Sequence, residues 1–229
     1  MNKFVITLKR IVGQNSLLFC LFYFLVKNKY RVVNKNTQFV LEGFPRSANT
    51  FSYVALKDVH PNLNIAHHLH LPIQIILGVK RKIPVVVLIR EPKDAILSLL
   101  LRDSRMNLDS AIRNYVSFYK IAIKFRDDII VADFNDVIVD FNIIIAKINL
   151  KFNIDLEEFD LSPNNIQKCK KLVKEMDTRD TGLSVVNNST VGLPTREKEL
   201  RKLQLLQKHK DIDVHLTLAN DIYRSLINK

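Results

Sequence analysis

The chain has 229 residues, of which 47% are hydrophobic and 25% are charged. This composition supplies enough apolar side chains for one sizeable core and excludes a disordered chain. The formal net charge of +12 favours anionic partners, such as nucleotides, nucleic acid, acidic glycans or a membrane surface, without choosing among them.

The N-terminal 36 residues are expected to form a hydrophobic helical segment ahead of a single domain over residues 37–229. The apolar run Leu17–Val26 is too short to span a bilayer. No small-x-small cleavage site follows it, as a signal peptide would require. We favour a helix packed on the domain, and the alternative is contact of residues 11–26 with a membrane surface.

The number of cysteines indicates the cellular compartment of the protein. The two cysteines, Cys20 and Cys169, are too few for a disulfide framework, so we expect reduced thiols. Reduced thiols indicate a cytoplasmic protein. This protein would be attached to the inner surface of the membrane if residues 11–26 bind there.

Short apolar runs alternate with longer stretches of helical spacing through the first two thirds of the chain. The run Pro84–Ile89, PVVVLI, is continuous and mostly β-branched, which is typical of a strand buried on both faces of a parallel sheet. Proline, glycine or polar residues end most runs. In chain order we expect a strand over Gln38–Phe44, a helix from Asn49 to Lys57, a strand over Asn64–His68, a helix over Leu71–Lys80, the strand Pro84–Ile89, a helix to about Arg102, a helix over Asp109–Arg126, a strand within Asp128–Phe134 and a helix over Asn135–Phe152.

From Pro163 onward the pattern is mainly helical, interrupted by the polar segment Asp177–Pro194. We expect that segment to be a long, mobile loop. Strands that alternate with helices predict an α/β fold. We therefore expect a three-layer, P-loop-like sheet of mostly parallel strands flanked by helices, with a mainly helical C-terminal third.

The first candidate site is the turn after the first strand, Gly43–Thr50, GFPRSANT. Free backbone N–H groups and the helix dipole face outward in such a turn, so a phosphate fits there. The spacing is similar to the nucleotide loop G-x-x-x-x-G-K-[ST], but Ala48 stands at its second glycine and Asn49 at its lysine. A kinase needs that lysine, whereas the cation here is Arg46. An ordinary strand–helix turn is the alternative without function.

The second candidate site follows the strand Pro84–Ile89. Arg90 ends this strand, and Ser98 lies eight residues later on the next predicted helix. A guanidinium fork suits phosphate oxygens, and a serine hydroxyl can bond to the same group. Without a ligand, Arg90 would pair with Glu91 or Asp94, and Ser98 would bond to a helical carbonyl. Both sites follow predicted strands, where open α/β sheets bind ligands.

Three of the six histidines lie between these two segments, at His67, His68 and His70. An imidazole suits a general base because its ordinary pKa lies near working pH. Zinc binding is the alternative. In an extended segment His68 and His70 face one side and His67 the other, so three ligands would not converge. We therefore favour a catalytic role over a metal site.

Together these segments resemble the family of sulfotransferases that use 3′-phosphoadenosine-5′-phosphosulfate (PAPS). Pro45–Thr50, PRSANT, is similar to the family's 5′-phosphosulfate loop, P-[KR]-S-G-[TN]-T, with Ala48 in place of the glycine. Arg90–Ser98 is similar to its 3′-phosphate segment, R-[DNE]-P-[KRV]-D-x-x-x-S, and Val131–Asp136 to its Y-E-D-L segment. The resemblance covers roughly residues 38–152.

The resemblance implies the co-substrate and the roles of the site residues. PAPS would donate a sulfuryl group to a hydroxyl or amine of a small-molecule, glycan or lipid acceptor, without a metal. The product would be adenosine-3′,5′-bisphosphate (PAP). The family's base lies in an H-L-P context, which slightly favours His70 over His68, and Arg46 would stabilise the leaving phosphate. The nucleotide would be bound by Arg46, Ser47, Ala48, Asn49, Thr50, Arg90, Ser98 and, from a C-terminal basic segment, Arg196, with Lys198 as its substitute.

Three other functions stay open at this point. An ATP-dependent P-loop phosphotransferase is the first, although Asn49 weakens it. A basic nucleic-acid-binding protein is the second, supported only by net charge, since the chain has no tryptophan and no recognised binding motif. An inactive adaptor is the third, because Ala48 is atypical. We expect no specific nucleic-acid partner, and the sequence does not indicate an oligomeric state.

Overall fold

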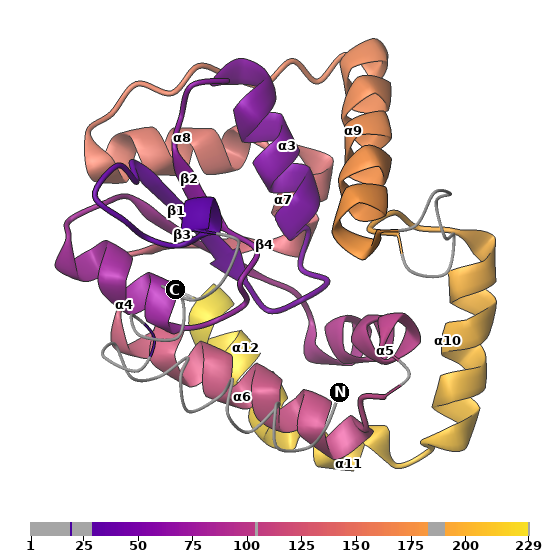
Figure 1. Cartoon of the computed structure of the whole chain (residues 1–229). Helices are drawn as coiled ribbons and strands as arrows, with labels where there is room; N and C mark the ends of the chain where they lie inside the picture. The colour runs from indigo at the N-terminus through magenta and orange to yellow at the C-terminus, as the bar shows by residue number, and fades with distance from the viewer. Residues whose placement is uncertain (1–18, 20–28, 104, 183–190, 229) are drawn as a thin grey trace.

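The computed structural model of the chain describes residues 19, 29–103, 105–182 and 191–228. Within these ranges it contains one sheet of four parallel strands in the order β2-β1-β3-β4 (Figure 1). The strands are β1 (Phe39–Gly43), β2 (Ile65–His67), β3 (Val85–Ile89) and β4 (Ile130–Asp133). Each lies within a range expected to be a strand, and the predicted parallel α/β fold is confirmed.

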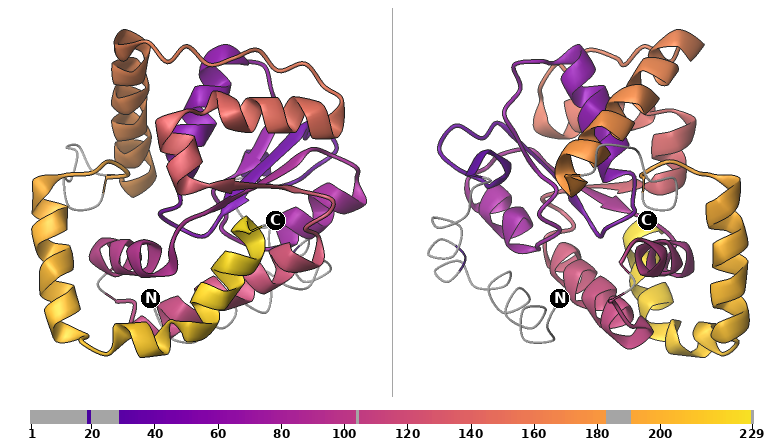
Figure 2. Two further views of the ribbon diagram at one scale, coloured as in Figure 1. Left: turned by 180° about the vertical axis from the view of Figure 1, so that it is seen from behind. Right: turned by 45° about the vertical axis from the view of Figure 1, so that its right-hand side comes forward.

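Helices cover both faces of the sheet and give three layers (Figure 1 and Figure 2). Helices α3, α7 and α8 cover one face, with α9 packed on α3, and helices α4, α5, α6 and α12 cover the other. The helices are α3 (Asn49–Val59), α4 (Ile73–Lys80), α5 (Pro92–Arg102), α6 (Leu108–Lys124), α7 (Phe134–Val139), α8 (Asn142–Phe152), α9 (Pro163–Thr181), α10 (Arg196–Lys208), α11 (Ile212–His215) and α12 (Thr217–Ile227), besides the 3₁₀ turn η1 (Lys29–Arg31).

The core consists of two apolar layers that the central strands separate. Every residue of β1 and β3 is buried, because these strands have a neighbour on each side and a helix layer on each face. Val40 and Val87 point into the layer under α4 and α6, whereas Leu41 and Leu88 point into the layer under α3 and α8. This alternation follows from the two-residue period of a strand.

Two predicted boundaries are wrong. The helix expected over Asn135–Phe152 is broken into α7 and α8, because the Asp140 carboxylate accepts a hydrogen bond from Asn142 N at 2.9 Å, and this contact replaces a helical one. Helix α9 continues to Thr181, beyond the position where we expected the loop of residues 177–194 to begin. It ends where Gly182 takes a φ of 70°, the left-handed conformation that closes many helices.

Almost all of the N-terminal segment for which we predicted a hydrophobic helix lies outside the described residues. The exception is Phe19, which is fully buried against Leu71 and Ile73. Among the described residues, no helix is both long enough and apolar enough to cross a membrane. Cys169 is buried and free, and Cys20 lies outside the described residues.

Candidate nucleotide-binding and transfer site

Three neighbouring strands end in the three segments that the sequence singled out. The turn Gly43–Thr50 follows β1, Arg90 follows β3, and the histidines lie at and after the end of β2. Because β1 lies between β2 and β3 in a parallel sheet, the carboxyl ends of all three strands meet at one edge. The sheet therefore brings these three segments together, whereas the sequence predicted this position only for the first two.

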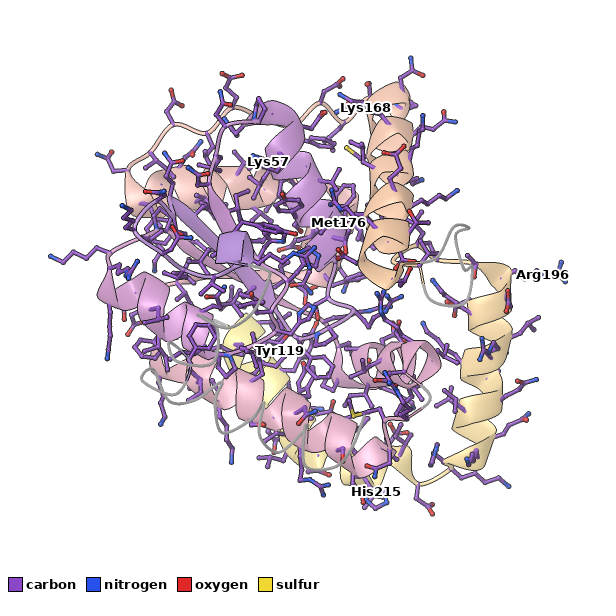
Figure 3. The ribbon with its side chains drawn as sticks, in the orientation of Figure 1. Lys57, Tyr119, Lys168, Met176, Arg196 and His215 are labelled. Atoms are coloured by element: carbon purple, nitrogen blue, oxygen red, sulfur yellow. The ribbon has the colours of Figure 1, made fainter. Side chains whose placement is uncertain are left out.

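The turn after β1 is held by hydrogen bonds from two sides. Asn49 Nδ2 donates to the Phe44 carbonyl at 3.0 Å, so this residue closes the loop from inside. The Tyr119 hydroxyl of α6 accepts from Phe44 N at 3.2 Å and donates to the Leu88 carbonyl at 2.8 Å. Figure 3 shows Tyr119 between α6 and the sheet. Only glycine fits at Gly43, because an added Cβ would lie 2.4 Å from the Leu88 carbonyl oxygen.

The backbone of this turn is strained at two residues. Arg46 has a φ of 75° and Ala48 a φ of 64°, both in the left-handed region. Ala48 is also the residue that precedes α3, and its side chain gives no cap to the helix. The first N–H groups of α3 therefore point toward the turn, which is the usual arrangement for binding an anion.

Arg46, Arg90 and Ser98 come into direct contact. Arg46 Nε donates to Ser98 Oγ at 2.9 Å, and Arg90 Nη1 donates to the Arg46 carbonyl at 3.3 Å. The alternative pairing expected for Arg90 also exists, since its Nη2 lies 2.8 Å from Asp94 Oδ2. Tyr115 fixes this end of β3 by donating to the Arg90 carbonyl at 2.7 Å. Arg90 Nε is buried and has no hydrogen-bond partner, and the guanidinium carbon lies over the Phe134 ring, 4.0 Å from its centroid.

Four cationic side chains surround the turn: Arg46, Arg90, Arg102 and Lys198. Burial, followed by the charges of Arg102 and Arg90, lowers the pKa of Arg46 to about 10. Burial and the charge of Arg46 lower the pKa of Lys198 to about 8. Asp177 of α9 offsets part of this charge, and its carboxylate lies 3.1 Å from Arg102. A cluster in which cations oppose one another is stabilised by a bound anion.

The C-terminal basic segment places Lys198, and not the expected Arg196, beside the turn. Arg196 is exposed at the first residue of α10, and its side chain points outward in Figure 3. Lys198 is buried instead, and its Nζ donates to the carbonyls of Val191 and Leu193. Arg46 Nη2 also donates to the Val191 carbonyl, at 3.0 Å. The structure thus brings Lys198 to the turn and leaves Arg196 away from it.

The histidines lie on the other side of the turn. His70 Nδ1 is 2.8 Å from the Gly43 carbonyl. Since a carbonyl can only accept, Nδ1 carries the proton and Nε2 keeps a lone pair. His68 Nε2 lies 3.1 Å from Thr50 Oγ1, which links the histidine segment to α3. His67 stacks on Tyr53 with ring centroids 3.8 Å apart.

All three imidazoles are held in the neutral form. Burial, which disfavours the charged ring, is the largest cause in each case, and neighbouring cations add to it. It lowers the pKa of His67 to about 3 and that of His70 to about 4. The pKa of His68 is lowered well below its ordinary value. At neutral pH each ring is therefore unprotonated, although a pKa so far below working pH makes it a weaker base than an ordinary imidazole.

Sequence reasoning missed Glu42, the residue before Gly43. Its side chain is fully buried, and its two oxygens accept backbone hydrogen bonds from Leu69 and His70, each at 2.9 Å. Burial raises the pKa of this carboxyl to about 7. The sequence did contain a signal for Glu42, because it is the only charged residue in the predicted strand QFVLEGF. Charged residues are rarely buried without a partner.

No metal-binding group of three or more histidine, cysteine, aspartate or glutamate residues occurs among the residues that the structure describes. His67 and His68 contact each other through ring nitrogens, His68 also contacts Thr50, and His70 contacts the Gly43 carbonyl.

Comparison with known proteins gives distant likenesses among solved structures alone. No family model matches the sequence, and no curated protein matches it. Among solved structures, mouse sulfotransferase SULT7A1 complexed with PAP is similar to this chain, with 13% sequence identity and a TM-score of 0.42, over 84% of this chain and 90% of that one. A likeness this distant identifies neither the activity nor the substrate of the chain.

Proposed function

We propose that the chain transfers a sulfuryl group from PAPS to a hydroxyl or amine of a small-molecule, glycan or lipid acceptor. One observation carries the proposal. The loop after β1 and the segment after β3, each similar to one half of a PAPS site, contact each other through Arg46 and Ser98 at 2.9 Å. Candidate bases from β2 lie beside the same loop.

The nucleotide would bind across the ends of β1 and β3. The 3′-phosphate is assigned to Arg90 and to the Ser98 hydroxyl, both of which contact Arg46. The 5′-phosphosulfate is assigned to the first N–H groups of α3 and to Arg46, a charged donor that forms short, strong hydrogen bonds with such oxygens. Lys198 lies beside Arg46 and replaces Arg196 as the C-terminal cation in this proposal.

The transfer breaks the bond between sulfur and the bridging phosphate oxygen, and forms a bond between sulfur and the acceptor oxygen or nitrogen. Negative charge develops on the departing phosphate, where Arg46 and the loop N–H groups would stabilise it. The acceptor proton would pass to Nε2 of His70, whose tautomer is fixed by the Gly43 carbonyl, and PAP would leave. His68 is the second candidate base.

Calorimetry with PAP and with ADP tests the nucleotide assignment. We expect PAP to bind far more tightly than ADP, because a 3′-phosphate is what distinguishes the two for Arg90 and Ser98. Equal affinities would overturn the proposal. Transfer of ³⁵S from labelled PAPS to phenol or octyl glucoside, as probe acceptors, should persist in EDTA. Loss of transfer in EDTA with recovery on adding Mg²⁺ would favour a phosphotransferase.

A further inference from the structure

The segment that carries the candidate bases has an unusual backbone. His68 has a φ of 58° and His70 a φ of 54°, the left-handed region that residues with a Cβ seldom adopt. Each such residue costs roughly 1–2 kcal/mol relative to ordinary backbone. Two in three residues form a turn that the local sequence does not favour, so contacts from elsewhere in the fold must hold it.

Glu42 supplies those contacts. Its two carboxylate oxygens each accept one backbone N–H of the turn, from Leu69 and from His70, both at 2.9 Å. The next residue of β1, Gly43, accepts from the ring of His70 at 2.8 Å. Two consecutive residues of one buried strand therefore fix both the backbone and the ring of His70.

The burial of the Glu42 carboxyl lowers the stability of the fold. The Glu42 side chain has no exposed surface, and a buried carboxylate is disfavoured by several kcal/mol before its hydrogen bonds are counted. The groups that face it are His70 and the backbone of Leu69 on one side and Gln74 of α4 on the other. An apolar residue at this position of β1 would fill the same core without that penalty.

We propose that Glu42 is a positioning residue that holds the His68–His70 turn in its reactive geometry. The inference rests on the proposed function, because only that function makes His70 or His68 a base. Glu42 contacts only the first residue of the nucleotide loop, Gly43, and does not touch the acceptor in this assignment.

The ionisation of Glu42 then couples the geometry of the base to pH. Above its pKa of about 7 the carboxylate accepts both N–H groups. Below it, the protonated acid carries an O–H donor on one oxygen and holds the turn less well. His70 titrates only near pH 4, so an acid limb in the rate near pH 7 would come from Glu42 and not from the base.

NMR tests the contact without any substrate. In the wild-type protein labelled with ¹⁵N, the backbone amide signals of Leu69 and His70 should shift together with an apparent pKa near 7. In Glu42→Gln, both titrations should disappear, because the amide does not ionise. Wild-type amide signals that do not move at any pH at which the protein stays folded would overturn the inference, whether or not the protein binds PAP.

Kinetics tests the positioning role. Misplacing a catalytic group by about 1 Å can cost about 10²-fold in rate, so kcat of Glu42→Gln should fall by about that factor with octyl glucoside as acceptor. PAP affinity should change less than about threefold, and the acid limb near pH 7 should be lost. Val40→Ala is the matched control, because Val40 lies on the same strand and face and its truncation lowers stability without touching the turn. Equal kcat losses in the two variants would show that Glu42 acts only through stability.

The two proposals can fail separately. If PAP does not bind and no transfer occurs, but the amides titrate and Glu42→Gln abolishes the titration, the proposed function is wrong and the structural role of Glu42 stands. If PAP binds and transfer occurs, but Glu42→Gln keeps the wild-type kcat and pH profile, the inference on Glu42 is wrong.

Discussion

Ala48 is the residue at which the phosphate turn departs most from a favourable local conformation. It stands where glycine is usual in such loops, and its φ of 64° is one that glycine adopts without steric cost. Ala48→Gly should therefore raise the free energy of unfolding by about 0.5–1 kcal/mol, the relief of left-handed strain less the greater freedom of glycine in the unfolded chain. Urea unfolding measures this change. A lower stability than wild type would mean that the turn relaxes in solution.

Arg90 is the residue on which nucleotide selectivity should depend. Its Nη2 pairs with Asp94 and its Nε has no partner in the described structure. Arg90→Ala should weaken PAP binding by about 1.5–3 kcal/mol, the range for a hydrogen bond to a charged group. ADP binding should change much less, since ADP lacks the 3′-phosphate.

Lys93→Ala is the control for this loss of charge, because Lys93 lies three residues away and pairs on the surface with Asp213. Calorimetry should show near wild-type PAP affinity for this variant. Equal losses for Lys93→Ala and Arg90→Ala would mean that only the net charge of the protein matters.

His70 should act on the acceptor and not on the nucleotide. A general base contributes roughly 10²–10⁴-fold to rate, so His70→Ala should lower kcat by about that factor and leave PAP affinity nearly intact. His67→Ala, which removes the stacking contact with Tyr53, should lower the melting temperature more than kcat. Near wild-type turnover in His67→Ala, His68→Ala and His70→Ala alike would show that none of the three is the base.

At the scale of elements, helix α4 depends on a close approach to the sheet at Gly78. A Cβ added there would lie 2.6 Å from Val85 Cγ2 and 2.9 Å from Val40 Cγ2. Gly78→Ala should destabilise the protein, because overpacking costs about 1–3 kcal/mol, against a gain of about 1 kcal/mol in helix propensity. PAP affinity should not change.

A double variant tests this explanation. Val85→Ala removes the methyl group nearest to the added Cβ, so Gly78→Ala should cost less in the Val85→Ala background than in the wild type. Additive losses of stability in the two variants would show that the contact with Val85 is not the cause.

The existence of the strands and their positions along the chain could be predicted, because each strand is a short apolar run bounded by residues that break it. The break at Asp140 could not, since it depends on one side-chain hydrogen bond competing with the helix. The length of α9 was also missed. Its last turn carries Asp177 and Asp180, whose carboxylates pair with Arg102 and Arg31, partners that are distant in sequence.

At the scale of the whole molecule, the topology of the sheet decides which predicted site residues meet. Sequence motifs identified Arg46, Arg90 and Ser98, because their spacing is local, and the strand order β2-β1-β3 brings them together. The choice between Arg196 and Lys198 depends on how α10 is rotated, which their spacing of two residues does not reveal. Glu42 was missed because its partners lie 27 and 28 residues away.

The buried histidines and Glu42 should make the stability of the whole molecule depend on pH in opposite senses. His67 and His70 titrate near pH 3 and 4 in the folded protein, against about 6.5 when unfolded. The unfolded chain therefore binds more protons between pH 4 and 6.5, and stability falls as pH falls through that range. Glu42, with a folded pKa of about 7, binds its proton more readily in the folded protein, so it opposes this loss between pH 4.5 and 7.

The effect of the three histidines on stability should together be larger than that of the one carboxyl. We expect the free energy of unfolding to change little from pH 7.5 to 6.5, where protonation of Glu42 in the folded protein is offset by protonation of the histidines in the unfolded chain. It should then fall by about 2 kcal/mol or more by pH 4.5, since each pKa unit corresponds to about 1.4 kcal/mol per group. Urea unfolding at four pH values measures the profile. Glu42→Gln should make stability fall already between pH 7.5 and 6.5 and should steepen the later fall, whereas His215→Gln, on the exposed surface of α11 (Figure 3), should leave the profile as it is. A stability that stays constant from pH 7.5 to 4.5 in the wild type would show that the three imidazoles and the carboxyl are not buried together in solution.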